Sequence, residues 1–471
     1  MTHKGKTCLI FLVAILSSLS AAKDFRVSVI SDMHVDMKYD PQVSADLYCT
    51  RGEKRDQVPA PYGRHGCDSP YVLFASAVMK MKEAEPSPDL ILVPGDFVTH
   101  SLIYKSGAIN KRADKEFNET RYQEIMDTVE NVAQSIAREF PGSPIVFTQG
   151  NGDYLYNYQV PDQTRKARHY SALYYYWIAN IPSNKKAATA ENFFSMREHG
   201  GYVQEIRKDL VVISFNSNYY TVHNRVENDP GIPKSLFRWL ESQLLLAQSK
   251  HQKVILLYHI PHGTYTAPVS RPSFWVEEYK AEMYRLLQRY NDTVSMSFTG
   301  HLHHFNIQSA DQARLQAEFN YNSLVVMRAV SPIRVNNPGF SVFTYTSHGD
   351  ERLMHPAYYD EYTFLLSHTV GTTEDPQRFW VHLYNSRQDL GLEDLSPAGI
   401  GRFIASLVQD PKRLVRYTMY KIGEPFSEDK AKWVAQVCGR LFPTDIGRCV
   451  LGLFTRFLPR YGVEEIDDGV R

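Results

Sequence analysis

The sequence has little cysteine, no excess of either charge, and no long apolar run after its first 22 residues. None of its five cysteines stands in a C-x-x-C pair, which argues against a zinc site built from thiolates. Lysine and arginine together number 52, as do aspartate and glutamate. No net charge therefore attracts nucleic acid or an anionic membrane to the molecule as a whole. An anionic substrate must bind at a local site.

The first 22 residues have the pattern of a secretory signal peptide. Lys4 and Lys6 precede an apolar stretch at 8–16, and small residues at 20–22 provide a cleavage site. The stretch is shorter than the ~20 residues that span a bilayer, although a retained membrane anchor is the alternative. We therefore expect a secreted protein or a protein of the lysosomal or vacuolar lumen.

Cysteine and asparagine patterns agree with export. Removal of the leader leaves four cysteines, which allow three pairings. Closure of short loops favours Cys49–Cys67 and Cys438–Cys449. Asn118 and Asn291 each begin an N-x-T triplet, so both are acceptor sites for N-glycans in the secretory route, unless the triplets arise by chance.

Apolar, partly β-branched runs alternate with helical patterns in the next part of the chain. The runs predict buried strands at 25–30, 89–93, 144–148, 210–215, 254–257, 294–298, 323–327 and 340–345. The patterns between them predict helices at 71–82, 122–140 and 236–247. This alternation predicts an α/β domain at 23–385 with two facing sheets and helices outside. After it we expect a small helical C-terminal subdomain at 386–471, with helices at 397–409, 411–422 and 431–442.

Five short polar motifs follow five of the predicted strands. They are Asp32-x-His34, Gly95-Asp96, Gly150-Asn151, His259 and Gly300-His301-x-His303. In layered α/β folds, ligands bind just beyond the carboxyl ends of strands, so these side chains are expected to converge. Residues two apart point to one side of an extended chain, so each x-spaced pair can offer two ligands. Imidazole, carboxylate and amide oxygen together suit zinc, manganese or iron.

Taken singly, each motif has a simpler explanation. An isolated Asp-x-His is more often a surface pair than a metal site, and Gly-Asp or Gly-Asn is usually a turn. The five motifs in order, each after a strand, favour a two-metal site. The tyrosine-rich segment 154–190 also has two interpretations: packing within a helix, or a groove for substrate beside the metals.

With this ordered series the chain resembles the calcineurin-type metallophosphoesterases, and within them acid sphingomyelinase and the acid sphingomyelinase-like phosphodiesterases. Further motifs of that branch are Cys67-Asp68-Ser69-Pro70, Gly95-Asp96-Phe97-Val98-Thr99-His100, Tyr258-His259-Ile260-Pro261-His262-Gly263 and Asn337-Pro338-Gly339-Phe340. The resemblance covers about residues 25–460. It implies a four-layer α-β-β-α metallophosphoesterase sandwich, completed by the helical tail.

The resemblance also implies two metal ions, which are usually zinc in this branch. One ion would be held by Asp32, His34, Asp96 and His303, and the other by Asp96, Asn151, His259 and His301. Asp96 would bridge the two. A hydroxide shared by the cations would attack phosphorus in line. His100 would then protonate the departing oxygen.

One position departs from the family pattern. A histidine usually follows the asparagine of the site, whereas this chain has Gly152. Three interpretations are open: His100 protonates the leaving group alone, the leaving group needs little protonation, as a phosphate does, or the enzyme is slow.

We expect a phosphodiesterase that hydrolyses phosphodiester or phosphoanhydride bonds in phosphodiester, nucleotide or polyphosphate substrates. An endopolyphosphatase and a non-catalytic metal-binding protein of the same fold are the alternatives. Phosphocholine esters, sphingomyelin and contact of the helical tail with membrane stay open, and the sequence does not determine the oligomeric state.

Overall fold

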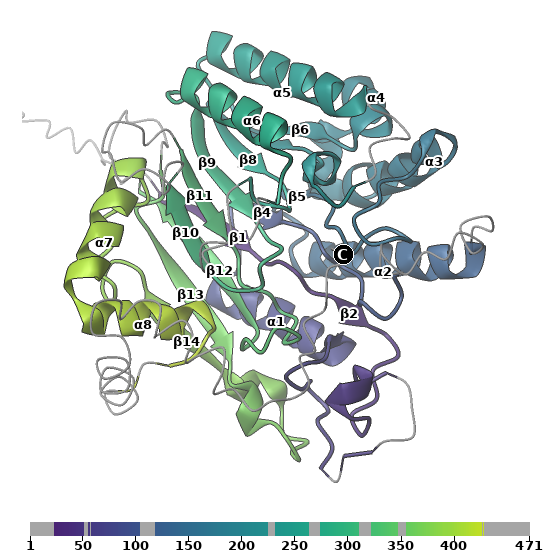
Figure 1. The fold of residues 1–471 in the computed structure, drawn as a ribbon, viewed down its shortest axis with the longest axis vertical. Helices are drawn as coiled ribbons and strands as arrows, with labels where there is room; N and C mark the ends of the chain where they lie inside the picture. Colours follow the sequence, from purple (N-terminus) through teal and green to yellow (C-terminus); the bar gives the residue numbers. More distant parts are fainter. Residues whose placement is uncertain are drawn as a thin grey trace, which may run out of the picture.

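Two six-stranded sheets face each other in the computed structural model, which describes residues 23–50, 55–56, 58–103, 118–224, 231–262, 274–309, 322–346, 355–425 and 427. The Ser214 hydroxyl of one sheet donates to the Phe147 carbonyl of the other at 2.7 Å. The rings of Phe298 and Phe343 meet edge to face between the sheets. Helices lie outside both sheets (Figure 1), so the expected α/β sandwich is confirmed.

The first sheet has the order β14-β13-β12-β1-β4-β5. Its strands are β1 (Phe25–Val29), β4 (Leu90–Val93), β5 (Ile145–Phe147), β12 (Gly339–Tyr345), β13 (Tyr358–Phe364) and β14 (Trp380–Asn385). β1, β4 and β5 run parallel, with Val27 beside Leu90 and Leu92 beside Val146. Their carboxyl ends therefore meet at one edge of the sheet.

The second sheet has the order β10-β11-β9-β8-β7-β6. Its strands are β6 (Tyr202–Arg207), β7 (Leu210–Ser214), β8 (Lys253–Leu257), β9 (Val294–Thr299), β10 (Asn306–Ser309) and β11 (Ser323–Val326). The four central strands are parallel, and β6 and β10 are antiparallel at the edges. A two-stranded ribbon, β2 (Val35–Asp36) with β3 (Ser69–Pro70), lies outside both sheets. Strands that are buried on both faces have continuous apolar sequences, so they could be predicted from the sequence.

The helices have the following bounds: α1 (Tyr71–Ala84), α2 (Glu119–Glu139), α3 (Gln163–Tyr174), α4 (Ala190–His199), α5 (Ile232–Ser249), α6 (Glu277–Arg289), α7 (Pro397–Gln409) and α8 (Pro411–Lys421). Short helical turns are η1 (Ala45–Leu47), η4 (Tyr175–Ala179), η5 (Pro182–Ala187), η6 (Ser217–Tyr220), η8 (Leu366–His368) and η9 (Pro376–Phe379). α5 packs on β7 and β8, and α1 packs on β12 of the other sheet. In Figure 1, α6 lies beside α5, and α2 lies to the upper right of α1, which it contacts.

Two helices begin earlier than their apolar patterns. α2 begins at Glu119 rather than 122, because the Asn118 side chain accepts from the Arg121 amide and caps the first turn. α5 begins at Ile232 rather than 236, with Pro233 in its first turn. Side-chain capping and proline therefore extend both helices beyond their buried faces.

The last strand ends at Asn385, and α7 and α8 follow it, with α7 packed on β10. The third helix expected there, 431–442, lies outside the described residues, as does the leader at 1–22. In the described part of the chain, no helix has the length and apolarity that a membrane span requires.

A buried ion pair joins this C-terminal part to the sheets. The guanidinium of Arg328 contacts the Glu361 carboxylate at 2.8 Å, and neither side chain is exposed to solvent. The same guanidinium donates to the carbonyls of Tyr362 at 2.8 Å and Tyr420 at 3.4 Å, so it links β13 to α8. A Cβ at Gly423 would lie 2.3 Å from Arg328 Nη1, so only glycine fits against it. Burial raises the pKa of Glu361 to about 7, although the charge of Arg328 opposes this.

The structure contains the predicted Cys49–Cys67 disulfide, with 5.8 Å between the two Cα atoms. It closes the polar loop that precedes β3 and α1. Cys438 and Cys449 lie outside the described residues. The tyrosine-rich segment mostly packs inward: Tyr170, Tyr174 and Trp177 are buried in the core.

Candidate metal centre

All seven predicted ligands follow the carboxyl ends of strands, on the side of the molecule where those ends of the two sheets lie next to each other. Those of the first sheet are Asp32 and His34 after β1, Asp96 after β4 and Asn151 after β5. Those of the second sheet are His259 after β8, and His301 and His303 after β9. Six of the seven are buried, and His301 is partly exposed. The structure therefore brings the whole predicted set together from the two sheets.

The backbone reaches this site through left-handed turns. Asp32, His34, Asp96, His301 and His303 all have positive φ, between 42° and 76°. Our expectation that the x-spaced pairs lie on extended chain was therefore wrong, because both pairs turn sharply off their strands. Non-glycine residues rarely take this conformation, and hydrogen bonds hold it here: Asp32 N donates to Gly95 O and His34 N to Asp96 O, each at 3.0 Å.

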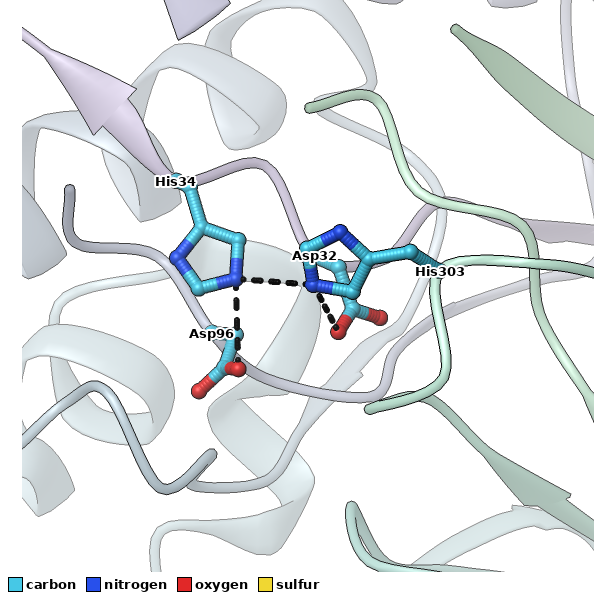
Figure 2. Close-up of side chains that lie close together, drawn as sticks. All are labelled: Asp32, His34, Asp96 and His303. Atoms are coloured by element: carbon cyan, nitrogen blue, oxygen red, sulfur yellow. Dashed lines mark hydrogen bonds and ion pairs between the residues drawn. The ribbon is translucent and has the colours of Figure 1, made fainter. Parts of the chain in front are cut away.

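Four side chains form the first cluster (Figure 2). His34 Nε2 lies 3.2 Å from Asp96 Oδ2 and 3.2 Å from His303 Nε2. His303 Nε2 lies 3.5 Å from Asp32 Oδ1. All four ligand atoms lie within 4.8 Å of one another, which is the spacing needed to surround one cation.

The second cluster shares Asp96 with the first. Asp96 Oδ2 lies 3.1 Å from His259 Nε2, and these two residues with His301 offer ligand atoms within 4.8 Å of one another. Asn151 Oδ1 lies 3.1 Å from His259 Nε2 and 2.8 Å from His301 Nδ1. Asp96 therefore stands between two ligand sets, as a bridging carboxylate would.

In their neutral form, the rings of His34 and His259 each point a nitrogen lone pair into the ligand clusters. His34 donates from Nδ1 to the Val98 carbonyl at 2.9 Å, and His259 donates from Nδ1 to the Pro94 carbonyl at 2.8 Å. When its ring is neutral, each histidine therefore turns an unprotonated Nε2 toward the cluster. Facing lone pairs of nitrogen and carboxylate oxygen repel unless a cation or a proton lies between them. The carbonyls that fix the rings are the kind of support that metal-binding histidines have, so the residues fit a pair of divalent cations.

The electrostatics also favour positive charge at this place. Burial works against ionisation, but the carboxylate of Asp96 raises the pKa of His34 to about 10 and that of His259 to about 9. Burial likewise opposes the charge of Asp96, yet His259 and His34 hold the pKa of Asp96 well below its usual range. Protons therefore compete with metal ions for the same nitrogens.

Glycines and one further carboxylate shape the turns. A Cβ at Gly150 would lie 1.9 Å from Asp96 Oδ1, and one at Gly300 would lie 2.4 Å from Asp32 Oδ2. Asp153 is buried and accepts from the amides of Asp96, Phe97 and Gly150 at 2.7–3.0 Å. Sequence reasoning missed Asp153, whose only signal is its place two residues after Asn151.

His100 lies beside the first cluster. Its ring stacks on the ring of His34, with 4.1 Å between centroids, and its side chain is 25% exposed. Nδ1 donates to Asp68 at 3.0 Å, which leaves Nε2 for another partner. Burial lowers the pKa of His100, while Asp68 opposes that shift. His100 is therefore placed to give a proton to a molecule bound at the centre.

Asp68 is the second residue that sequence reasoning missed as part of the site. Its carboxylate accepts from the Thr99 hydroxyl at 2.9 Å, the His100 amide at 2.8 Å and the Ser331 hydroxyl at 3.1 Å. Burial works against its charge, but His100 outweighs this and the pKa of Asp68 falls to about 2. In the sequence, Asp68 was noted only as part of the Cys67-Asp68-Ser69-Pro70 motif, which supports the family resemblance but does not indicate what Asp68 does.

Gly152, the position that departs from the expected pattern, lies against the first cluster. Its amide donates to Asp96 Oδ1 at 2.7 Å. A Cβ there would be 3.2 Å from Asp96 Oδ1 and 3.5 Å from Cε1 of His34. A side chain at position 152 would therefore enter the metal centre directly.

Residues 25–305 match the family described as calcineurin-like phosphoesterase. The chain belongs to this family. It is 26% identical over 402 residues to cyclic GMP-AMP phosphodiesterase SMPDL3A of Bos taurus, which covers 83% of this chain and 82% of that one. It is 26% identical over 407 residues to acid sphingomyelinase-like phosphodiesterase 3b of Homo sapiens, with 83% and 81% covered.

A solved dimetal phosphatase from Danio rerio aligns with a TM-score of 0.40 and 11% identity, covering 72% of this chain and 95% of that chain. The family predicted from the motifs is confirmed, and the relatives carry the names of phosphoric diester hydrolases. Zinc as the metal stays a prediction, as does glycosylation of Asn118 and Asn291, both of which are exposed.

Proposed function

We propose that the protein is a secreted or lysosomal phosphodiesterase that uses two zinc ions to hydrolyse phosphodiester or phosphoanhydride bonds. The observation that carries this proposal is the position of Asp96, whose Oδ2 lies 3.2 Å from His34 Nε2 and 3.1 Å from His259 Nε2. One carboxylate shared by two imidazole-rich ligand sets would hold two cations as close together as a two-metal hydrolase needs.

A bound pair of cations would supply positive charge for the phosphoryl oxygens and lower the pKa of a water molecule between them. Asp32, His34, Asp96 and His303 would hold one, and Asp96, Asn151, His259 and His301 the other. The strand-end turns fix these side chains before substrate arrives, so little rearrangement is needed on binding.

His100 acts as the general acid in this proposal. Its Nδ1 donates to Asp68, so the proton that it gives to a leaving oxygen comes from Nε2. Asp68 is a positioning residue, because it holds the ring and stabilises the protonated imidazole. The names of the relatives, a cyclic GMP-AMP phosphodiesterase and an acid sphingomyelinase-like phosphodiesterase, support phosphodiesters as the substrate class.

Export rests on two observations, the signal-like pattern at 1–22 and the Cys49–Cys67 disulfide, which is typical of oxidising compartments. Expression in a secretory host followed by N-terminal sequencing tests it. Protein recovered from the medium with cleavage near Ala22 is the expected result, and an uncleaved, cell-retained chain would contradict it.

The activity is tested with purified protein, measured for zinc by elemental analysis and assayed on bis(p-nitrophenyl) phosphate. We expect about two zinc ions per chain and loss of hydrolysis on chelation. His303→Ala should lose both zinc and activity. An active His303→Ala variant, or wild-type protein that turns over no phosphodiester when loaded with metal, would refute the proposal.

Gly152 favours a second candidate, a non-catalytic metal-binding protein, because the family's histidine at this position is absent. The complete ligand set and the paired His100 and Asp68 favour the enzyme. Restoring the histidine separates the two candidates, as described below.

A further inference from the structure

The turn that follows β7 is polar and buried, although none of the seven predicted ligands follows this strand. It consists of Asn216 and η6, and the side chains of Asn216, Ser217 and Asn218 are completely buried. Burying amide and hydroxyl groups costs free energy unless they form hydrogen bonds. The contacts of these side chains therefore indicate what the turn supports.

Asn218 contacts the loop that carries the ligand Asn151. Its carboxamide nitrogen donates to the carbonyls of Gln149 and Gly150, each at 3.3 Å, and to Oδ1 of Asn216 at 3.0 Å. The Gly150 carbonyl belongs to the peptide group that joins Gly150 to Asn151. Holding this peptide group therefore sets the direction in which the Asn151 side chain leaves the loop.

Ser217 contacts the loop that carries the ligand His259. Its hydroxyl accepts from the amide of Ile260, the next residue, at 2.8 Å. The His259 carbonyl accepts from the Gly300 amide at 2.9 Å, and Gly300 directly precedes the ligand His301. Backbone hydrogen bonds therefore connect Ser217 with both histidines of the second cluster.

The first cluster is held by other parts of the chain. The Ser331 amide donates to the Asp32 carbonyl at 3.0 Å, and the Ser69 amide donates to the His34 carbonyl at 3.2 Å. Ser331 follows β11, and Ser69 lies in β3. The supports of the two clusters therefore come from different segments, so a change in η6 can affect one cluster more than the other.

We propose that Ser217 and Asn218 are positioning residues that set the affinity of the second cation site. The inference rests on the proposed two-metal function. Each residue acts on the backbone beside a ligand, so it decides whether the ligand side chains are already in place when a cation binds. Partners that orient metal ligands typically change metal affinity by about 10- to 100-fold. A purely structural role would lower stability and leave zinc affinity unchanged.

The test titrates zinc into metal-free protein by calorimetry, which requires no turnover. Wild-type protein should show two sites. Asn218→Ala should weaken the binding of one zinc ion by roughly 10- to 100-fold and leave the other within about threefold. Ser217→Ala should weaken the same site, because the Ile260 amide loses its acceptor, and Ser217→Thr should recover part of the affinity, because it keeps a hydroxyl.

A matched control is Asn192→Ala. Asn192 is a buried asparagine on α4 whose carboxamide also donates to two backbone carbonyls, those of Ala187 in η5 at 2.8 Å and Val203 in β6 at 2.7 Å. Its loss should lower the urea midpoint of the metal-free protein, as the loss of Asn218 does, and should leave both zinc affinities unchanged. The comparison separates the positioning of ligands from general stability.

A ligand variant shows which site Asn218 supports. His259→Ala removes a ligand of the second cluster, so it should bind one zinc ion. Adding Asn218→Ala to this variant should leave the affinity for that ion within about threefold. A further loss of roughly tenfold or more would place the action of Asn218 on the first cluster and overturn the assignment.

Wild-type zinc affinities in folded Asn218→Ala and Ser217→Ala would overturn the proposal and leave the two-metal function standing. Equal losses of zinc affinity in Asn192→Ala would also overturn it. If Asn218→Ala does not fold, Ser217→Ala decides, and failure of both to fold would show a structural role instead. Wild-type protein that binds fewer than two zinc ions would refute the proposed function and the inference with it.

Discussion

Arg328 and Glu361 are as deeply buried as Asp32 and His34, yet their charges are compensated in a different way from those of the metal centre. Arg328 meets one carboxylate and two backbone carbonyls, so opposite charges and hydrogen bonds compensate each other within the protein. In the metal centre, His34 Nε2 and His303 Nε2 face each other at 3.2 Å, so a proton or a cation has to lie between them.

The comparison separates a structural ion pair from a binding site. Burying charge costs free energy in both places, and only partners can compensate for it. The Arg328–Glu361 pair obtains its partners from β13 and α8, so it stabilises the fold. The metal centre leaves lone pairs unsatisfied, so it gains most from cations. Each variant below disturbs one of the two and should leave the other intact.

The largest effect is expected for Asp96→Asn, which removes the shared carboxylate. Phosphodiester hydrolysis should fall by roughly 10³-fold or more, because neither cation keeps its full ligand set. In wild-type protein, zinc should raise Tm over the chelated state, since it binds the folded chain. That difference in Tm should vanish in Asp96→Asn and persist in Asp209→Asn, a control at a partly exposed carboxylate that pairs with Arg207. A zinc-dependent Tm in Asp96→Asn would contradict the assignment of the bridge.

Breaking the ion pair should act on stability alone. Glu361→Ala leaves the buried Arg328 uncompensated and should cost about 3–5 kcal/mol of unfolding free energy. The exposed pair of Glu393 and Arg402 offers a control, where Glu393→Ala should cost less than about 1 kcal/mol. Urea unfolding measures both, and zinc content should stay at the wild-type level. Loss of zinc in folded Glu361→Ala would show that the two groups of charges are coupled.

Removing the proton donor should lower the rate and leave the metals in place. His100→Gln should reduce kcat on bis(p-nitrophenyl) phosphate by about 10²-fold or more, with normal zinc content. Because burial lowers the pKa of His100, its acid form is lost as pH rises through a value below 6.5, so kcat should decline above that pH.

Asp68→Asn removes the negative charge that opposes the lowering of the His100 pKa. The decline of kcat should therefore begin at a still lower pH. A pH profile of kcat tests both variants. An identical profile for wild type and Asp68→Asn would argue against a positioning role for Asp68.

The smallest effect is expected for Gly152→His. With His100 already present, the added imidazole should change kcat by less than about tenfold. Gly152→Ala controls for the bulk of a side chain beside Asp96 and His34. A large gain from negligible activity would support the non-catalytic alternative.

Local patterns predicted much of the fold and the ligand set. The predicted strand at 254–257 is β8, which has one more residue at its start, and each ligand motif follows a strand as expected. These predictions succeeded because a buried strand and a polar turn are both recognised from residues that are neighbours in the sequence. Helix ends were less accurate, since α2 starts where Asn118 caps it and not where its apolar face starts.

The sequence by itself determined which residue types stand at the strand ends, and their chemistry already indicated a two-metal hydrolase. Only the tertiary structure decided what those residues meet. The left-handed turn at Asp32, the bond between Asp68 and His100 and the bond between Asn218 and the Gly150 carbonyl all depend on which loops share an edge of the two sheets. Such contacts join residues far apart in the chain, where neither spacing nor periodicity carries information about them.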